Sequence, residues 1–320
     1  MTLADIAISK MRPPSQMKII CIDITNRCNL SCSNCTRLLE NQVGYWDMSL
    51  DNFRKAVSSL SDFPGMIAII GGNPCMHREF EAICQILVEE IPDINHRGLW
   101  SNNVFKHTEL VVNTFGGFNL NAHGDTRGKA SLADVSKRVG DKAYLYQGNS
   151  KHAPLLAAIK DIYGEEKMWD LISKCDINQN WSATIIENQG NLRAYFCEVA
   201  GSFDVARKGD FGIEVRPNWW RASIESFSDQ IKHFCPGCGA AASIKGVKDN
   251  LEIDTFTKSN IDLVAISRDV NKRETTELDV SSVDVSTKRI THYANYDFTL
   301  IRRIRHIVRL RTRVRKFFRR

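Results

Sequence analysis

The amino-acid sequence predicts an α/β protein built on a parallel sheet, and two observations support that prediction. Residues 18–172 alternate between short apolar runs, typical of buried strands, and longer stretches with apolar residues at helical spacing. Strands that alternate with helices form a parallel sheet, because each crossover returns the chain to the same end. A polar loop rich in cysteine follows the first apolar run, where a β/α barrel carries its reactive groups.

The expected elements follow one another along this region. The first strand is expected within residues 18–25, and further strands are expected at residues 66–70, 98–101, 118–122 and 143–147. Helices are expected at residues 50–60, 80–90 and 154–163. In the first of these helices the apolar residues Phe53, Val57 and Leu60 recur three or four positions apart, which places them on one face.

Cysteine usage indicates a reducing compartment. The chain has ten cysteines in 320 residues, too few for a disulfide scaffold. Residues 1–10 lack the basic start and apolar core of a signal peptide, and no run of about 18 apolar residues predicts a membrane span. We therefore expect a cytoplasmic protein. Cys21 and Cys84 fall inside an expected strand and helix, where a thiol is normally a small buried hydrophobic group.

Three cysteines near the start of the chain form the most informative motif. Cys28, Cys32 and Cys35 have the spacing C-x3-C-x2-C and lie among Asn and Ser in a polar loop. Three thiolates can ligate three irons of a 4Fe–4S cluster and leave the fourth iron open to a substrate or cofactor. We therefore expect a cluster that takes part in chemistry; the alternative is that these thiols are ordinary buried side chains.

This motif resembles the cysteine loop of the radical S-adenosylmethionine (SAM) superfamily. The segment Gly71-Gly72-Asn73-Pro74 follows the second apolar run, where that family has a Gly-Gly-Glu-Pro segment that receives the amino group of SAM. The resemblance implies a partial (β/α)6 TIM-like barrel, a 4Fe–4S cluster on the three cysteines, and SAM held by this segment. Asn73 replaces the usual Glu, and Asn34 replaces the usual aromatic residue that contacts adenine, so we expect an altered SAM affinity.

Polar residues after the third and fourth expected strands are further candidates for the SAM pocket. They are Asn102, Asn103, Asn121, His123 and Asp125. Parallel strands end at one edge of a barrel, so these side chains would face the same pocket. The alternative role of each is a turn residue that ends its strand. Of the five, Asn102, Asn121 and His123 are our candidates for cofactor binding.

A second set of four cysteines lies downstream: Cys175, Cys197, Cys235 and Cys238. A hairpin with strands at residues 181–187 and 192–196 is expected between the first two, and a helix at residues 217–234 leads into the C-x2-C pair. Four cysteines make a closed ligand set, for which structural zinc is one interpretation. Beside a radical SAM barrel this order resembles the Twitch subdomain, a shortened SPASM domain, which implies an auxiliary 4Fe–4S cluster that carries electrons.

These features divide the chain into five segments. They are an N-terminal segment (1–17), the radical SAM partial barrel (18–172), the auxiliary-cluster subdomain (173–248), a polar linker or edge strand (249–292) and a basic amphipathic helix (293–320). Within the fourth segment, residues 275–286 alternate weakly, so an edge strand and an exposed linker are both open.

The last segment concentrates positive charge. Residues 301–320 hold nine Arg, one Lys and no acidic residue, whereas the rest of the chain has 33 Lys and Arg against 37 Asp and Glu. On a helix, Ile304, Ile307 and Phe318 share an apolar face and most basic residues lie opposite. Residues 300–320 are therefore expected to bind an anionic membrane surface from the cytoplasmic side. Docking on the protein itself or on a partner, and binding to nucleic acid, are the alternatives.

The resemblance implies that SAM is cleaved reductively to a 5′-deoxyadenosyl radical, which abstracts hydrogen from a C–H bond. We expect oxidation or rearrangement of a sugar, polyol or sugar conjugate, with the auxiliary cluster accepting an electron and a flavodoxin or ferredoxin supplying one. Peptide modification is the first alternative; only 17 residues precede the first strand, fewer than the leader-binding domain that peptide modifiers often carry. A non-catalytic iron–sulfur protein on membrane or nucleic acid is the second.

Overall fold

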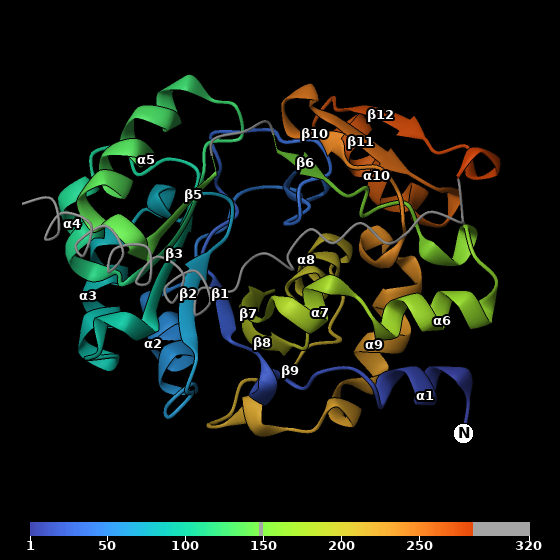
Figure 1. Cartoon of the computed structure of the whole chain (residues 1–320), viewed down its shortest axis with the longest axis horizontal. Helices are drawn as coiled ribbons and strands as arrows, with labels where there is room; N and C mark the ends of the chain where they lie inside the picture. The colour runs from blue at the N-terminus through green and yellow to red at the C-terminus, as the bar shows by residue number, and fades with distance from the viewer. Residues whose placement is uncertain (147–149, 284–320) are drawn as a thin grey trace, which may run out of the picture.

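An eight-stranded sheet lies at the centre of the computed structural model, which describes residues 1–146 and 150–283 (Figure 1). Its strand order is β5-β4-β3-β2-β1-β7-β8-β9. Neighbours from β5 to β7 pair in parallel, and β8 and β9 are added in antiparallel pairing. The strands are β1 (Ile19–Asp23), β2 (Met66–Ile70), β3 (Arg97–Ser101), β4 (Gly117–Asn121), β5 (Ala143–Tyr146), β7 (Ser182–Asn188), β8 (Asn191–Tyr195) and β9 (Ile213–Glu214). The α/β prediction is confirmed, and the six parallel strands form a partial TIM-like barrel.

The first strand occupies the middle of this sheet. Every residue of β1 is buried, as expected of a parallel strand that is covered on both faces. Cys21 of β1 pairs with Ala68 of β2 on one side and with Thr184 of β7 on the other. Cys21 and Cys84 are both buried free thiols, so their predicted role as small core residues is confirmed.

Helices connect the parallel strands and gather beside one half of the sheet (Figure 1). They are α2 (Leu50–Ser58), α3 (Phe80–Glu90), α4 (Thr108–Thr114) and α5 (Thr126–Val139). The local sequence explains α2: the Ser49 hydroxyl accepts the N–H of Asn52 and caps the helix, while Phe53 and Val57 are buried. The helices expected at residues 50–60 and 80–90 are therefore confirmed.

A second group of helices lies on the other side of the molecule (Figure 1). They are α1 (Leu3–Ile8), α6 (Glu165–Ser173), α7 (Asp176–Asn180), α8 (Glu198–Arg207) and α9 (Ser228–Phe234). Helix α1 contacts α6 and α9, and α8 contacts β7, β8 and α9. The start of the chain is thus held against helices from its second half.

The expected hairpin forms from β7 and β8, and its first strand is also the sixth parallel strand of the sheet. β7 pairs in parallel with β1 and in antiparallel register with β8. Gln189 and Gly190 form the turn with φ angles of 51° and 80°, which suits a two-residue hairpin connection. The central sheet therefore continues past residue 172.

The helix expected at residues 154–163 is wrong; only a short 3-10 turn is present there. Tertiary hydrogen bonds use the backbone groups that a helix would need. The carbonyl oxygens of Leu155 and Leu156 accept the N–H groups of Gly239 and Thr257. Local helical spacing could not reveal these partners, which lie about 80 to 100 positions further along the chain.

The helix expected at residues 217–234 is interrupted. Only its end is α-helical, as α9, and two 3-10 turns precede it. Trp219 and Trp220 are both buried; Trp220 packs edge-on against Phe63 and Trp219 against Phe227. Burying two adjacent large rings against different parts of the core favours a break over a continuous helix.

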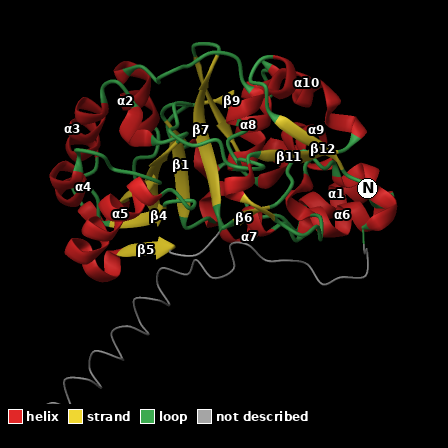
Figure 2. Cartoon of the chain, turned by 90° about the horizontal axis from the view of Figure 1, so that it is seen from above, coloured by secondary structure: helices red, strands yellow, loops and turns green. Residues whose placement is uncertain are grey.

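The last described part of the chain forms a small parallel unit beside the larger body (Figures 1 and 2). It contains β11 (Ile253–Phe256), α10 (Ile261–Asp269) and β12 (Glu274–Glu277), and before it β10 (Val247–Lys248) pairs with β6 (Lys151–His152). The edge strand considered for residues 275–286 is present in its first part, as β12.

The basic helix expected at residues 293–320 lies outside the described residues. Within the described ranges, no helix is long and apolar enough to cross a bilayer.

Candidate functional site

The three cysteines of the first motif lie together in the loop after β1. Burial raises the pKa of the Cys32 thiol, and the neighbouring Cys35 and Cys28 raise it further, which shows that the three sulfurs are close. All three side chains are partly exposed, unlike Cys21 or Cys84. The structure therefore separates these thiols from those of the core.

Hydrogen-bond donors point at the sulfurs of this loop. Burial raises the pKa of Cys28 to about 11, and the N–H of Leu30 opposes that rise by donating to the sulfur. The side-chain amide of Asn102 also donates to Cys28 Sγ, at 3.4 Å. Burial also raises the pKa of Cys35, and the hydrogen bond from the backbone N–H of Arg37 partly opposes that rise. Donors of this kind stabilise thiolates and tune iron–sulfur clusters, so the loop fits three cluster ligands.

These cysteines line a cavity of about 610 Å3. Five of the other residues proposed from the sequence line the same cavity: Gly71, Gly72, Asn102, Asn121 and His123. Other walls come from side chains that the sequence analysis did not select, among them Arg37, Trp100, Lys151, His152, Trp181, Glu198 and Lys245. The structure thus brings the cysteine loop and most predicted cofactor residues to one space, although their roles stay predictions.

The two glycines after β2 pack directly against the backbone that leads into the cysteine loop. The N–H of Gly72 donates to the carbonyl oxygen of Thr25 at 2.8 Å, and Gly71 has a φ of 150°. A Cβ at Gly71 would collide with the Thr25 carbonyl, and one at Gly72 with the Arg27 carbonyl. Glycine is therefore required here by the close approach of two backbones, before any ligand is considered.

Asn73 is completely buried and its side chain is fully used by the protein. Its amide nitrogen donates to Asn102 Oδ1 at 2.5 Å and to the Asn103 carbonyl at 2.9 Å. Its amide oxygen accepts from the Cys75 N–H and the Ser101 hydroxyl, both at 3.1 Å. Asn73 therefore joins the ends of β2 and β3, and a direct contact of this side chain with SAM stays a prediction.

Three further residues selected from the sequence are not part of the cavity lining: Pro74, Asn103 and Asp125. Pro74 is buried at the start of a 3-10 turn. The side-chain oxygen of Asn103 accepts the N–H of Phe105 at 2.9 Å and the Ser131 hydroxyl at 2.9 Å. Asn103 therefore has the turn-forming role that was its alternative.

Asn34 attaches the C-terminal unit to the cysteine loop. Its side-chain oxygen accepts the N–H of Thr255, and its own N–H donates to Asp254 Oδ1, both at 2.8 Å. Arg273 donates to the carbonyl oxygen of Cys32 at 2.7 Å. The region treated as a linker or edge strand is therefore a clamp on the loop. The apolar residues spaced along 253–269 are the local pattern that indicates a packed unit here rather than a linker.

A buried ion triad, also missed, lies beside the cavity. Arg37 contacts Asp23 at 3.1 Å and Glu198 at 2.9 Å, and all three side chains are at most 5% exposed. Thr184 donates to Asp23 at 2.6 Å and Trp181 donates to Glu198 at 2.9 Å. Burial alone would lower the pKa of Arg37, but the charges of Glu198 and Asp23 outweigh burial and raise it. Arg37 therefore keeps its charge inside the triad.

The triad connects the two cysteine sets. Arg37 is two residues beyond Cys35, and Glu198 directly follows Cys197. Burial raises the pKa of Glu198, and the guanidinium of Arg37 opposes that rise. The sequence could not reveal this ion pair, because Arg37 and Glu198 are about 160 positions apart and meet only in the folded chain.

The four cysteines of the second set converge around a separate space of about 30 Å3. Burial raises the pKa of Cys235, and the charges of Cys175, Cys197 and Cys238 raise it further, so the four sulfurs are neighbours. Cys238 Sγ accepts the N–H of Ala240 at 3.4 Å. The remaining wall of this small space is mostly apolar. Ala240 lines both this space and the large cavity.

Two solved structures are similar to this chain. One is BtrN in complex with AdoMet and 2-DOIA, at 14% sequence identity and a TM-score of 0.47, over 71% of this chain and 94% of that chain. Another is selenomethionine BtrN in an open conformation, at 15% identity and a TM-score of 0.41, over 72% and 95%. The sequence matches no protein-family model and no curated protein. The functional proposal therefore rests on the residues of the site.

Proposed function

We propose that this chain is a radical SAM enzyme that acts on a small molecule. The observation that carries the proposal is the set of three converging thiols, with N–H donors aimed at their sulfurs, on the wall of a 610 Å3 cavity. Cys28, Cys32 and Cys35 would hold a 4Fe–4S cluster and leave one iron facing that cavity. With SAM bound there, the cluster supplies reductive cleavage to a 5′-deoxyadenosyl radical that abstracts hydrogen from the substrate.

The chain's own residues would position SAM. Gly71 and Gly72 line the cavity and would present backbone groups to SAM. Asn102 donates to Cys28, and Asn73 holds Asn102 in place through the 2.5 Å hydrogen bond. Asn121 lies on the same wall and is a second side-chain amide available to the ligand. Asn73 would thus act on SAM binding through Asn102 rather than by direct contact.

The cavity wall supports a sugar, polyol or sugar conjugate as substrate. Trp100 and Trp181 both line it with ring centroids 6.0 Å apart, and such rings offer apolar faces to a sugar ring. Arg37 and Glu198 line it as well and offer a donor and an acceptor for hydroxyl groups. With an auxiliary cluster to accept the second electron, oxidation of a C–OH group of such a substrate is the reaction that we propose.

The second cysteine set would hold an auxiliary 4Fe–4S cluster that accepts an electron from the substrate radical. Four thiols around a small, mostly apolar space of about 30 Å3 would ligate all four irons and leave none for a substrate. Ala240 borders both spaces, and the Arg37–Glu198 pair connects the two cysteine sets through the buried interior. A flavodoxin or ferredoxin would supply the electron that the cluster of the first set requires.

Metal analysis of the anaerobically reconstituted protein tests this proposal. We expect about eight iron and eight sulfide per chain, the content of two 4Fe–4S clusters. Replacing Cys28, Cys32 and Cys35 by Ala should remove about half of both and abolish formation of 5′-deoxyadenosine. Cys84→Ala, at a buried thiol outside both sets, is the matched control and should change neither quantity. Tightly bound zinc in the second set would contradict the auxiliary cluster.

Residues 300–320 would bring the enzyme to an anionic membrane surface, as their arginine-rich amphipathic pattern indicates. Deleting them should abolish co-sedimentation with vesicles that contain phosphatidylserine and leave SAM cleavage unchanged. Binding should fall steeply between 50 and 300 mM salt, because about ten charges act through a screened field. Retention of vesicle binding after the deletion, or preferential binding to RNA or DNA, would contradict this assignment.

A further inference from the structure

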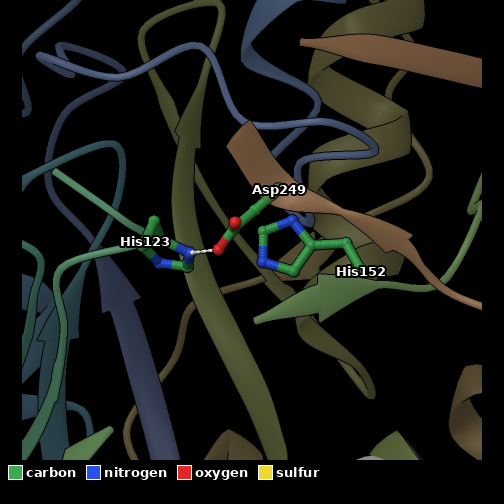
Figure 3. A group of neighbouring side chains, drawn as sticks. All are labelled: His123, His152 and Asp249. Atoms are coloured by element: carbon green, nitrogen blue, oxygen red, sulfur yellow. Dashed lines mark hydrogen bonds and ion pairs between the residues drawn. The ribbon is translucent and has the colours of Figure 1, made fainter. Parts of the chain in front are cut away.

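Three potential metal ligands outside both cysteine sets meet at the large cavity: His123, His152 and Asp249 (Figure 3). One ligand atom from each lies within 4.8 Å of the other two. His123 follows β4, His152 is in β6, and Asp249 comes directly after β10. The pairing of β6 with β10 therefore brings together residues that are about 100 positions apart.

His123 and Asp249 form a hydrogen bond whose length also suits two ligands on one ion. His123 Nδ1 lies 2.9 Å from Asp249 Oδ2 (Figure 3). Two ligand atoms that are each about 2.1 Å from a metal and at right angles lie about 3 Å apart. Asp249 is 1% exposed, and its carboxylate also accepts the hydroxyl of Ser150. A buried carboxylate needs partners of this kind, and a cation is the strongest of them.

His152 is oriented as a metal-binding histidine is. Its Nδ1 lies 2.8 Å from the carbonyl oxygen of Ser33. A carbonyl oxygen only accepts, so Nδ1 carries a proton, and in the neutral imidazole Nε2 is then the metal-binding nitrogen. Histidines that bind metals usually make this outer contact, because it fixes the tautomer and the ring orientation.

The backbone holds the group in place at a conformational cost. His123 has a φ of 48°, in the left-handed region that is unfavourable for histidine, and its N–H donates to Asn121 Oδ1 at 3.0 Å. The carbonyl of Asp249 accepts the N–H of Ser33 at 2.7 Å. Strained residues of this kind occur at functional sites, where the surrounding structure maintains them.

We propose that His123, His152 and Asp249 bind one divalent transition-metal ion of the zinc, iron(II) or manganese(II) class. Two imidazoles and one carboxylate form a donor set that suits these ions and leaves coordination positions free. Because both histidines line the large cavity, the free positions face the substrate space. An oxygen of a hydroxyl, carboxylate or phosphate group would bind there. Only this substrate role rests on the proposed function; the metal site does not.

Manganese(II) titration of the full chain, followed by electron paramagnetic resonance (EPR), tests the site. Oxidised 4Fe–4S clusters are EPR-silent, so the reconstituted protein can be used. We expect one Mn2+ per chain and electron spin-echo modulation from two imidazole nitrogens. His152→Ala and His123→Asn should each weaken binding at least about tenfold and remove one nitrogen. Asparagine is chosen at position 123 because it tolerates the left-handed backbone.

Two controls separate the outcomes. His96→Ala removes a histidine that donates to the Gly65 carbonyl elsewhere in the fold, and it should leave Mn2+ affinity unchanged. Replacing Cys235 and Cys238 by Ala, in the separate second set, should also leave it unchanged. Mn2+ affinity is measured without SAM or activity, so this site can stand if the proposed function fails. No Mn2+ binding by the unmodified chain, or unchanged affinity and nitrogen modulation in both histidine variants, would overturn the proposal.

Discussion

The two cysteine sets offer the same kind of ligand beside spaces of very different size. Cys28, Cys32 and Cys35 are partly exposed on the wall of a 610 Å3 cavity. The four cysteines of the second set surround about 30 Å3 of mostly apolar space. Three ligands beside a large space suit a cluster that binds a cofactor, and four ligands without such a space suit one that only carries electrons. Ligand number and adjoining space are therefore the two features on which the proposed roles differ.

The two sets are also held differently. The first lies on one loop, which is fixed by the glycines after β2 and by the clamp of residues 249–273. The second is assembled from the end of α6, the start of α8 and the segment after α9. The first set should therefore depend on loop packing, and the second on the docking of helices.

The largest difference between the two sets is expected in iron content and SAM cleavage when the second set alone is disrupted. Replacing Cys235 and Cys238 by Ala removes two of the four ligands and should remove about half of the iron, as is also expected of the triple variant of the first set. SAM cleavage by a chemical reductant should stay within about threefold of the unmodified chain, because the first set is intact. Iron content and 5′-deoxyadenosine measured on the same sample check this. Loss of cleavage in the double variant would show that the two sets do not act separately.

The next effect concerns the ion triad that connects the sets. Arg37→Met leaves Asp23 and Glu198 buried without a cation, which should lower the free energy of unfolding by about 3–5 kcal/mol. Arg54→Met is the matched control, since Arg54 pairs with Glu89 and Glu90 at the surface and should cost less than about 1 kcal/mol. Urea unfolding of the three proteins measures both values. An equal loss of unfolding free energy in the two variants would mean that the buried triad stabilises the fold no more than a surface ion pair does.

A smaller effect is expected at the glycines that hold the first set. Gly71→Ala brings a methyl group onto the Thr25 carbonyl and should cost about 2 kcal/mol of unfolding free energy. Gly164→Ala, where no atom lies within 4 Å of the added Cβ, should stay within about 0.5 kcal/mol. Thermal unfolding of the two variants is the measurement. A neutral Gly71→Ala would show that the two loops can separate without cost.

The smallest effect is expected at Asn73. Asn73→Ala leaves the Cys75 N–H without its side-chain acceptor, at a cost of about 1–2 kcal/mol, whereas the Ser101 hydroxyl can still donate to the Asn103 carbonyl. Because Asn102 loses its support, SAM affinity should fall several-fold while iron content stays the same. Asn95→Ala, at an exposed turn, is the control. Isothermal titration with SAM tests the effect, and unchanged affinity would show that the Gly71 and Gly72 backbone is sufficient.

The sequence revealed the elements whose signal is local. β1 to β5 were predicted because each is a short apolar run before polar residues, and the cysteine sets were found by their spacing. The hairpin was predicted, but not that β7 would pair with β1, because pairing between strands about 160 residues apart leaves no local pattern. His152, Asp249, Arg37 and Glu198 were missed for the same reason. Each is a single polar residue whose partners come from distant segments.

The EPR spectrum of the reduced Cys235→Ala, Cys238→Ala variant, recorded with and without SAM, tests the central claim most directly. In that variant only the first set can hold a cluster, and its three cysteines leave one iron open to SAM. We predict that SAM shifts the g values of this cluster and that the shift is absent when Cys28, Cys32 and Cys35 are replaced instead. A spectrum that SAM leaves unchanged would contradict the account.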